Sequence, residues 1–402
     1  MKNRKHYLDT LIKFIDKPFI KVITGIRRCG KSSLLLLLKQ HLLENGIQGE
    51  QILYINFESF EFSSITNEAT LYQYIKERTS QSAQKYYLLL DEIQVVNSWE
   101  KVINSFFLNP NVDIYITGSN AYLLSSELST LLSGRYVEVK MLPLSFKEYL
   151  NFLGVEDIED YTPYFNQYLR YGSFPSIINL LDTKETIPIF LEGIYNSVLL
   201  KDVIERNSVR DSVLLENVLK FISANIGNIV STKKISDFLT SSGRKTSSDT
   251  IENYLKMLES AFIIYKVPRY DLKGKMFLKT LEKYYIVDTG IRNEITGSSG
   301  SDYGYILENI VYLELLRRGY HICIGKTDSY EVDFVATKSD EKMYIQVSAT
   351  ILDEHTRERE LRPFTSIKDN FPKVLLTMDR LPFSDIEGIK LVHIMDFLLD
   401  GE

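Results

Sequence analysis

One short string combines the residue types that bind phosphate groups. Two glycines separated by four residues, followed by a lysine and a serine, form a pattern typical of a phosphate-binding loop. The backbone N–H groups of such a loop point at an anion, and the start of the following helix adds positive potential. The lysine reaches the β- and γ-phosphates of a nucleotide, and the serine hydroxyl binds Mg²⁺. We therefore predict that ATP is held by Gly25, Ile26, Arg27, Arg28, Cys29, Gly30, Lys31, Ser32 and Ser33.

Within this loop we assign Ser32 as a Mg²⁺ ligand. Cys29 is interpreted as a small residue that fills space and not as a nucleophile. An ordinary loop of turn residues is the alternative interpretation, and it is weakened because the string follows a β-rich run and opens a helical segment.

An acidic pair follows an almost fully apolar run. Residues 86–90 (YYLLL) are typical of a strand buried on both faces, and Asp91 and Glu92 come directly after it. Ligands of open α/β sheets bind at the carboxyl ends of the strands. We predict that Asp91 supports the Mg²⁺ shell and that Glu92 polarises the attacking water. The alternative is an acidic strand end without chemistry.

A third polar segment, ITGSN at 116–120, ends another apolar run. Ser119 or Asn120 would hydrogen-bond the water or the γ-phosphate, and we assign Asn120 to the catalytic set. Gly118 and Asn120 also suit a tight turn, so this signal has a structural alternative.

The fourth element is LSGR at 132–135. Arg135 is a candidate arginine finger, which stabilises transition-state charge within the same chain or from a neighbouring subunit. A surface arginine before a strand is the alternative, and both remain open.

These residues require a parallel α/β sheet to position them. The first third of the chain alternates β-rich runs with helical segments, which is typical of such a sheet. A helix is expected at 32–43. The predicted strands are 19–24, 51–57, 86–90, 112–117 and 136–140.

The remainder of the chain changes pattern three times. Residues 143–209 are helical, with a break at 171–175, and are interpreted as a helical lid. Three helical stretches and two β-rich runs (262–267 and 283–287) then follow in the order of a winged helix. A Gly/Ser tract at 297–302 is a predicted linker.

The last segment begins with a helix at 305–318 and continues into a predicted hairpin. Its strands are 331–336 and 343–349, joined by a polar turn at 337–342. A charged helix from Asp353 and a strand at 373–377 are expected to close the chain.

Composition limits the class of protein. The 402 residues are 44% apolar and 25% charged, with a net charge of −6, so two to four globular domains are expected and bulk nucleic-acid coating is not. No apolar run is long enough for a membrane span. Two cysteines and five scattered histidines predict neither a disulfide framework nor a zinc site. We expect a cytoplasmic protein without a membrane partner.

In their order along the chain, these motifs resemble a prokaryotic family of AAA-type P-loop ATPases. Members join the P-loop domain to a winged helix and a C-terminal domain similar to restriction endonucleases. The matching segments are GIRRCGKSS (25–33), LLLDEIQ (88–94), ITGSN (116–120), LSGR (132–135), PLSFKEYL (143–150), YGSFP (171–175), EVDF (331–334) and YIQVS (344–348).

The resemblance implies an α/β fold in four parts and the cofactors ATP and Mg²⁺. The expected parts are an AAA-type core at 1–150, a helical lid at 151–210, a winged helix at 211–296 and a restriction-endonuclease-like α/β domain at 303–402.

For the last domain, the resemblance implies a vestigial nuclease site. Asp333 and Gln346 match the metal positions, and Glu308 matches an auxiliary acid. Ser348 stands where the family pattern of nucleases has lysine, and without that ammonium the developing charge loses a partner. We therefore expect little or no cleavage, with Arg357 or Arg359 as the side chains that would threaten this interpretation.

The winged helix points weakly toward DNA. Its candidate recognition helix, 247–260, carries Asp249, Glu252 and Glu259 against Lys256, whereas a helix for a phosphate-lined groove should be basic. We favour a structural or protein-contact role. DNA and protein both remain candidate partners, beside ATP and ADP, and a homo-oligomer is a further candidate.

Three functions fit the sequence. The first is an ATPase whose turnover moves or remodels a partner, and the second is a slow nucleotide switch or DNA-binding regulator with negligible turnover. A P-loop kinase for a small molecule is disfavoured because Asp91 and Glu92 would activate an unwanted water.

Overall fold

The computed structural model describes residues 2, 4–79, 84–121, 134–278, 281–297, 302–327 and 329–400. The chain forms two compact units. One extends to Met141 and includes Ser260–Phe262, and the other comprises Leu142–Glu259 and the chain from Ile263 onward. Residues 132–133 of the LSGR motif and residues 298–301 of the predicted linker lie outside the described residues.

A five-stranded parallel sheet forms the centre of the first unit, in the order β2-β3-β4-β1-β5. Each predicted strand of this region is confirmed to within about one residue at each end, because apolar β-rich runs between turn residues are a strong local signal. The strands are β1 (Ile20–Thr24), β2 (Ile52–Asn56), β3 (Tyr86–Asp91), β4 (Val112–Gly118) and β5 (Tyr136–Lys140).

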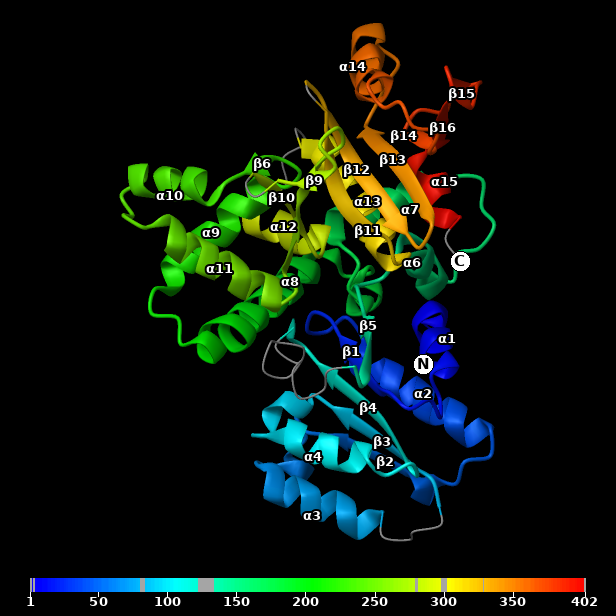
Figure 1. Cartoon of the computed structure of the whole chain (residues 1–402), viewed down its shortest axis with the longest axis vertical. Helices are drawn as coiled ribbons and strands as arrows, with labels where there is room; N and C mark the ends of the chain where they lie inside the picture. The colour runs from blue at the N-terminus through cyan, green and yellow to red at the C-terminus, as the bar shows by residue number, and fades with distance from the viewer. Residues whose placement is uncertain are drawn as a thin grey trace. The chain divides into compact units, whose positions relative to one another are not determined.

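Helices cover both faces of this sheet (Figure 1). The apolar residues of α3 and α4 pack with one face of the strands in a single core cluster, whereas α2 packs against β3 and β4 on the other face. Every residue of β3 is buried, as its apolar run predicts. The helices are α1 (Lys5–Lys13), α2 (Lys31–Glu44), α3 (Glu68–Arg78) and α4 (Trp99–Phe107).

The second unit begins with the helical region predicted at 143–209. After α8 the chain continues as a π-helical segment, Val198–Glu205. The helices of this unit are α6 (Phe146–Leu153), α7 (Thr162–Tyr171), α8 (Ile187–Ser197), α9 (Ser212–Ala224), α10 (Thr232–Ser241), α11 (Ser248–Ser260), α12 (Thr289–Thr296), α13 (Tyr303–Arg317), α14 (Glu354–Thr365) and α15 (Ile394–Leu399). None of the helices described here is long and apolar enough to cross a membrane.

A small antiparallel sheet accompanies the three helices α9, α10 and α11, with one strand between α9 and α10 and two strands after α11. Its strand order is β6-β10-β7, from β6 (Ile229–Val230), β7 (Ile264–Val267) and β10 (Glu282–Ile286). Strand β7 lies within the predicted run 262–267, and β10 is shifted by one residue from the predicted run 283–287. Strand β6 was not predicted, because two residues carry no periodic pattern.

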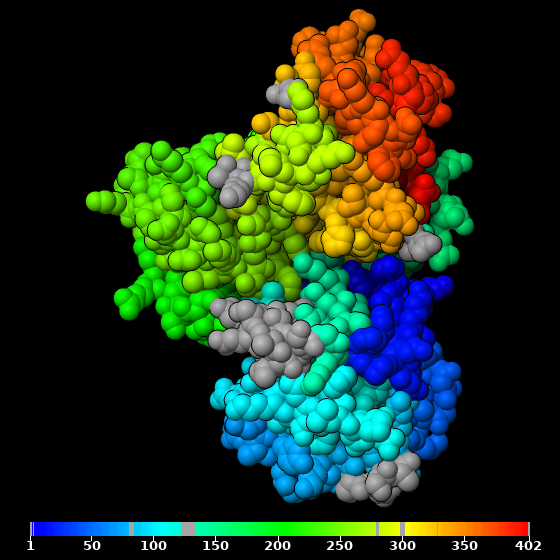
Figure 2. All heavy atoms as spheres, in the orientation of Figure 1, coloured from blue at the N-terminus to red at the C-terminus, as the bar shows by residue number. Residues whose placement is uncertain are grey.

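The second sheet of this unit has eight strands in the order β15-β16-β14-β13-β12-β11-β8-β9. The strands are β8 (Arg269–Asp271), β9 (Met276–Phe277), β11 (His321–Lys326), β12 (Glu331–Lys338), β13 (Glu341–Ser348), β14 (Lys373–Thr377), β15 (Asp385–Ile386) and β16 (Ile389–His393). Two of them, β8 and β9, come from an earlier part of the chain: β8 pairs in parallel with β11, and β9 pairs with β8. Figure 1 labels β9 beside the C-terminal strands, and in Figure 2 the yellow-green atoms of this part of the chain lie beside the orange ones.

Two details of the C-terminal segment correct the sequence analysis. The predicted turn at 337–342 was too long, because β12 and β13 pair as far as Lys338 and Glu341 and leave Ser339 and Asp340 to turn the chain. The strand at 373–377 does not close the chain, since β15, β16 and α15 follow it. These elements are short and are separated by polar turn residues, so they were not predicted from the sequence.

Helix α13 is the central helix of the second unit. All residues from Ile306 to Leu315 are buried, so its polar side chains must find partners inside the protein. The Asn309 side chain accepts a hydrogen bond from Ile286 N at 2.8 Å and donates one to Ile286 O at 2.9 Å. These two bonds fix α13 against strand β10.

Candidate functional site

The predicted phosphate loop connects β1 to α2 at the carboxyl edge of the parallel sheet. Three of its residues have positive φ angles: Gly25 (146°), Arg28 (66°) and Gly30 (108°). A Cβ atom on Gly25 would lie 2.1 Å from Met141 O, so this position accepts only glycine without a shift of the backbone. The loop is thus held closely against the end of β5.

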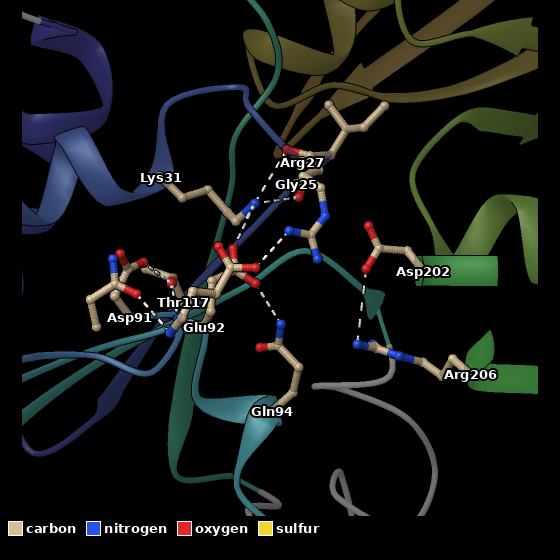
Figure 3. A network of polar contacts seen from close by, with 12 residues as sticks. Gly25, Arg27, Lys31, Asp91, Glu92, Gln94, Thr117, Asp202 and Arg206 are labelled. Carbon is tan, nitrogen blue, oxygen red and sulfur yellow. Dashed lines mark hydrogen bonds and ion pairs between the residues drawn. The ribbon is translucent and has the colours of Figure 1, made fainter. Parts of the chain in front are cut away.

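Lys31 begins α2 and points back into the loop (Figure 3). Its Nζ donates hydrogen bonds to Gly25 O at 3.0 Å and Ile26 O at 3.2 Å, and lies 3.3 Å from Glu92 Oε1. The side chain is buried. A single ammonium therefore bridges the loop and the acidic end of β3, which the sequence separates by about 60 residues.

Asp91 is buried at the end of β3, where Thr117 reaches it from β4. Thr117 Oγ1 donates to Asp91 Oδ1 at 2.6 Å and accepts a hydrogen bond from Glu92 N at 2.9 Å. Burial raises the pKa of Asp91, while hydrogen bonds from the Thr117 and Ser32 hydroxyls oppose this shift. Thr117 was not among the predicted site residues, although it belongs to the ITGSN segment. Ser32 and Asp91, both assigned to Mg²⁺, are therefore neighbours, since the Ser32 hydroxyl acts on the pKa of Asp91.

Glu92 has a left-handed backbone conformation, with φ of 54°. Burial disfavours its charge, but the Lys31 ammonium, a hydrogen bond from Gln94 and the charge of Arg27 together lower the pKa of Glu92. A carboxyl group with a lowered pKa is ionised at neutral pH, as an acceptor for a polarised water must be. Gln94 is a further residue that sequence reasoning missed (Figure 3).

The other loop residues differ in exposure. Cys29 is fully buried, and burial raises the pKa of its thiol, which agrees with a space-filling role. Arg4 Nη1 donates to Cys29 O at 3.1 Å, a contact that the sequence did not reveal. Arg28 and Ser33 are exposed. Arg27 forms an ion pair with Glu58 at 2.6 Å.

Ser119 and Asn120 lie directly after β4 and are fully buried. Strand β4 neighbours β1, with Gly118 level with Thr24, so both residues follow the sheet edge that carries the phosphate loop. This placement agrees with the predicted position of Asn120.

Arg135 lies at the opposite edge of the sheet. It precedes β5, and its carbonyl accepts a hydrogen bond from Ile20 N at the start of β1. The five-residue length of β1 separates this edge from the loop by roughly 16 Å. Arg135 Nη1 donates to Asn104 Oδ1 at 3.2 Å. Arg135 therefore begins about one strand length away from its own chain's phosphate loop, because the residue before a parallel strand and the residue after it occupy opposite edges.

The four residues of the predicted nuclease-like site lie together in the second unit. They line a cavity of about 850 Å³. Gln346 Oε1 accepts a hydrogen bond from Asp333 N at 3.2 Å, and Gln346 Nε2 donates to Glu360 Oε2 at 2.9 Å. Ser348 donates its hydroxyl to Thr350 O at 2.8 Å. Glu308 reaches the same cavity from α13.

A lysine from another sheet also enters this cavity. Lys283 of β10 forms ion pairs with Glu308, Glu331 and Asp333. No motif marked Lys283 in the sequence. Its alternation with Tyr285 in β10 was the one signal, because it places both side chains on the same face of the strand.

The two arginines that might have supplied the missing charge each have an acidic partner on α14, and Arg359 lines the cavity together with its partner Glu360. Arg359 forms an ion pair with Glu360 at 2.7 Å, and Arg357 lies 4.0 Å from Glu354. Burial, together with the charge of Glu308, raises the pKa of Asp333 to about 8, and the Lys283 ammonium acts in the opposite direction.

Comparison with known proteins places two family models on the chain. A model described as an AAA domain matches residues 17–150, and one described as a domain of unknown function matches residues 162–302. An uncharacterized protein of Haemophilus influenzae is 46% identical over 401 residues, which cover 99% of each chain. An uncharacterized protein of Methanocaldococcus jannaschii is 35% identical over 380 residues, covering 90% of this chain and 81% of that protein.

Among solved structures, a Walker-type ATPase of Pyrococcus abyssi is similar in fold. The TM-score is 0.51 at 15% sequence identity, and the similarity covers 73% of this chain and 96% of that one. The AAA-type α/β fold expected for the first part of the chain is therefore confirmed, together with its parallel sheet.

Proposed function

The chain belongs to the same protein family as the uncharacterized Haemophilus influenzae protein and has an AAA domain, and we propose that this domain binds ATP with Mg²⁺ and hydrolyses it. The observation that carries the proposal is the convergence of Lys31, Asp91 and Glu92 at one edge of the sheet. Hydrolysis requires three kinds of group: an ammonium that binds phosphate, a buried carboxylate beside a hydroxyl that bind Mg²⁺, and an ionised carboxylate that polarises water.

Each residue has a separate role in this proposal. Lys31 leaves the carbonyls of Gly25 and Ile26 to hold the β- and γ-phosphates, and Ser32 with Asp91 would hold Mg²⁺. Bound Mg²⁺ would neutralise charge that develops on the phosphates. Once Lys31 is engaged by phosphate, Glu92 is released to orient the attacking water.

Asn120 completes the site. We place it beside the water or the γ-phosphate, because it follows the strand that neighbours β1 and is buried at the same edge. The amide would hold its partner by a hydrogen bond, as buried polar side chains require.

The second unit is proposed to respond to the nucleotide. We assign a helical lid to 151–210, a winged helix to 211–296 and a restriction-endonuclease-like domain to 303–402. The order of α9, β6, α10, α11, β7 and β10 supports the winged helix, and the β12–β13 hairpin beside an acidic cavity supports the nuclease-like domain.

We favour a protein as the partner of the winged helix. Helix α11 carries more acidic than basic residues, and Lys256 is already paired with Glu252 at 2.7 Å. A DNA groove lined with phosphates would repel this surface.

Phosphate release at steady state tests the proposal. Wild-type protein should hydrolyse ATP in the presence of Mg²⁺. Lys31→Ala should abolish ATP binding, whereas Glu92→Gln should bind ATP at least as tightly as wild type and lose hydrolysis. If Glu92→Gln turns over at the wild-type rate, the assignment of the water-polarising residue is wrong.

The same assay distinguishes an ATPase that remodels a partner from a slow nucleotide switch. An ATPase that remodels a partner should turn over many times per minute, with DNA stimulation if DNA is the partner. The alternative, a slow nucleotide switch, predicts a single turnover on the scale of the nucleotide exchange time with or without DNA. The Lys31–Glu92 ion pair favours neither mode, since both exchange it for nucleotide contacts.

A further inference from the structure

An ammonium group lies among the carboxylates of the cavity in the second unit. Lys283 Nζ is 2.9 Å from Glu308 Oε1, 2.9 Å from Glu331 Oε1 and 3.5 Å from Asp333 Oδ1. The lysine side chain is 5% exposed, so water does not screen these contacts appreciably. Burial disfavours its charge, but the three carboxylates outweigh this effect and raise the pKa of Lys283.

This position is where the proposed kinship with restriction endonucleases implies a divalent cation. The oxygen atoms there do not fit one. Glu308 Oε1 accepts hydrogen bonds from Lys283 and from Tyr285 Oη at 2.6 Å, and Asp333 Oδ2 accepts one from Val347 N at 3.0 Å. In the part of the chain that the structure describes, no group of three or more His, Cys, Asp or Glu side chains is arranged to hold a metal ion.

The amide oxygen of the second expected ligand is also engaged. Gln346 Oε1 accepts from Asp333 N, and its Nε2 binds Glu360, which holds the amide in one orientation. A divalent cation would have to displace both the ammonium and these hydrogen bonds. Two cations cannot share the same carboxylates without strong repulsion.

The lysine is held in place by the backbone that carries it. Strand β10 pairs with β6 and β7 on its two sides, and the Asn309 amide binds both backbone groups of Ile286. Asn309 directly follows Glu308 in α13, so the strand and the helix bring Lys283 and Glu308 together as one rigid arrangement.

We propose that Lys283 takes the place of the divalent cation, so that the cavity is an internal ion-pair cluster that binds no Mg²⁺ and cleaves no phosphodiester. The inference rests on the proposed nuclease-like character of this domain and is independent of ATP hydrolysis. It also supplies a reason for inertness beyond the serine at 348: the site contains a lysine, but one that neutralises the would-be metal ligands.

The test is a Mn²⁺ titration of the full-length, nucleotide-free protein, followed by electron paramagnetic resonance. The binding that belongs to the cavity is defined as the part that Asp333→Asn removes. Wild type and Asp333→Asn should give the same titration. Lys283→Ala should gain a site at least about tenfold tighter than any cavity binding in wild type, and Asp333→Asn should abolish it again.

Three further measurements keep the test decisive. Mn²⁺ should raise the unfolding temperature of Lys283→Ala and restore much of the stability lost with the ammonium. Lys283→Arg, which retains the charge, should gain no site. Lys266→Ala removes a lysine of the neighbouring strand β7 that pairs with Glu282 and serves as the matched control.

Two outcomes would overturn the proposal. One is cavity binding of Mn²⁺ by wild type, seen as a loss in Asp333→Asn, which is measurable even if Lys283→Ala does not fold. The other is a folded Lys283→Ala protein without a new site. An inactive ATPase domain would change neither result, so the failure of the proposed ATPase function is distinguishable.

Discussion

At the scale of single residues, the nucleotide site depends on hydroxyl and amide groups that hold its charged side chains. The Thr117 hydroxyl contacts both members of the acidic pair, because it donates to the Asp91 carboxylate and accepts from the backbone N–H of Glu92. The Gln94 side-chain amide donates a hydrogen bond to the other end of the pair, at Glu92 Oε2. Such supporting groups set the orientation of a carboxylate and hence the metal or water that it can hold.

Thr117→Val tests this support, because valine keeps the shape of threonine and removes the hydroxyl. Asp91 then loses its 2.6 Å hydrogen bond and Glu92 N loses its acceptor. We expect kcat of ATP hydrolysis to fall by roughly 10- to 100-fold, with ATP affinity changed much less. Steady-state phosphate release and a nucleotide-binding titration measure the two effects.

Thr10→Val is the control, since the Thr10 hydroxyl donates a hydrogen bond to the backbone of its own helix at His6 O and lies outside the acidic pair. Its kcat should equal that of wild type. An unchanged kcat in Thr117→Val would show that Asp91 is oriented without the hydroxyl.

At the scale of elements, the phosphate loop depends on a close approach between the ends of β1 and β5. Gly25 fits against Met141 O because it has no Cβ atom, and its φ of 146° is one that other residues rarely adopt. A side chain there must move either the loop or the end of β5.

Gly25→Ala should therefore lose ATP binding and destabilise the protein by about 1–3 kcal/mol or more. A nucleotide-binding titration and urea unfolding measure these losses. Gly49→Ala is the matched control, because a Cβ atom at Gly49 meets nothing within 4 Å. ATP binding of wild-type strength in Gly25→Ala would mean that the loop tolerates a shift of this end.

The acidic cavity between β10, α13 and the β12–β13 hairpin predicts a pH-dependent stability. The pKa of Asp333 is raised to about 8 by burial and by Glu308. Because the folded-state pKa exceeds the unfolded value of about 3.9, the folded protein binds the extra proton between these limits. The stability that this proton contributes is complete below pH 4 and is lost as the pH rises through about 8.

We expect the unfolding free energy to fall by up to about 1.4 kcal/mol per pH unit below pH 8 as the pH rises. Asp333→Asn, which cannot ionise, should flatten this dependence in urea titrations between pH 6 and 9. Asp340→Asn, exposed in the turn of the same hairpin, is the control. A wild-type slope retained in Asp333→Asn would assign the dependence to another group.

At the scale of the whole molecule, the position of Arg135 links its proposed role as an arginine finger to the formation of a homo-oligomer. The residue lies at the amino edge of the sheet, away from its own phosphate loop. We expect an arginine finger at this edge to act on a nucleotide held by a second copy of the chain. The finger role and a homo-oligomer therefore stand or fall together.

Arg135→Ala should lower turnover by about 10³-fold, with nearly unchanged ATP affinity. Mixing it with Lys31→Ala should restore some activity, because each chain supplies the group that the other lacks. Arg78→Ala, which removes an exposed arginine stacked on Tyr74, is the control in the same unit. A monomer at assay concentration, with no rescue on mixing, would leave Arg135 as a surface residue.

The sequence by itself determined the features that are contiguous along the chain. The loop from Gly25 to Ser33, the five strands of the parallel sheet and the acidic end of β3 are each encoded within a few neighbouring residues. Apolar runs, turn residues and glycine spacing act locally, so their structural consequence can be predicted without the rest of the fold.

Only the tertiary structure decided which side chains meet across long separations. Thr117 lies 26 residues from Asp91, and Lys283 lies 25 residues from Glu308 in a different element. Strands β8 and β9 join the C-terminal sheet, although they follow the helices α9 to α11 in the chain. Contacts of this kind depend on which strands pair and on which oppositely charged side chains are buried together. Neither choice leaves a periodic pattern in the sequence.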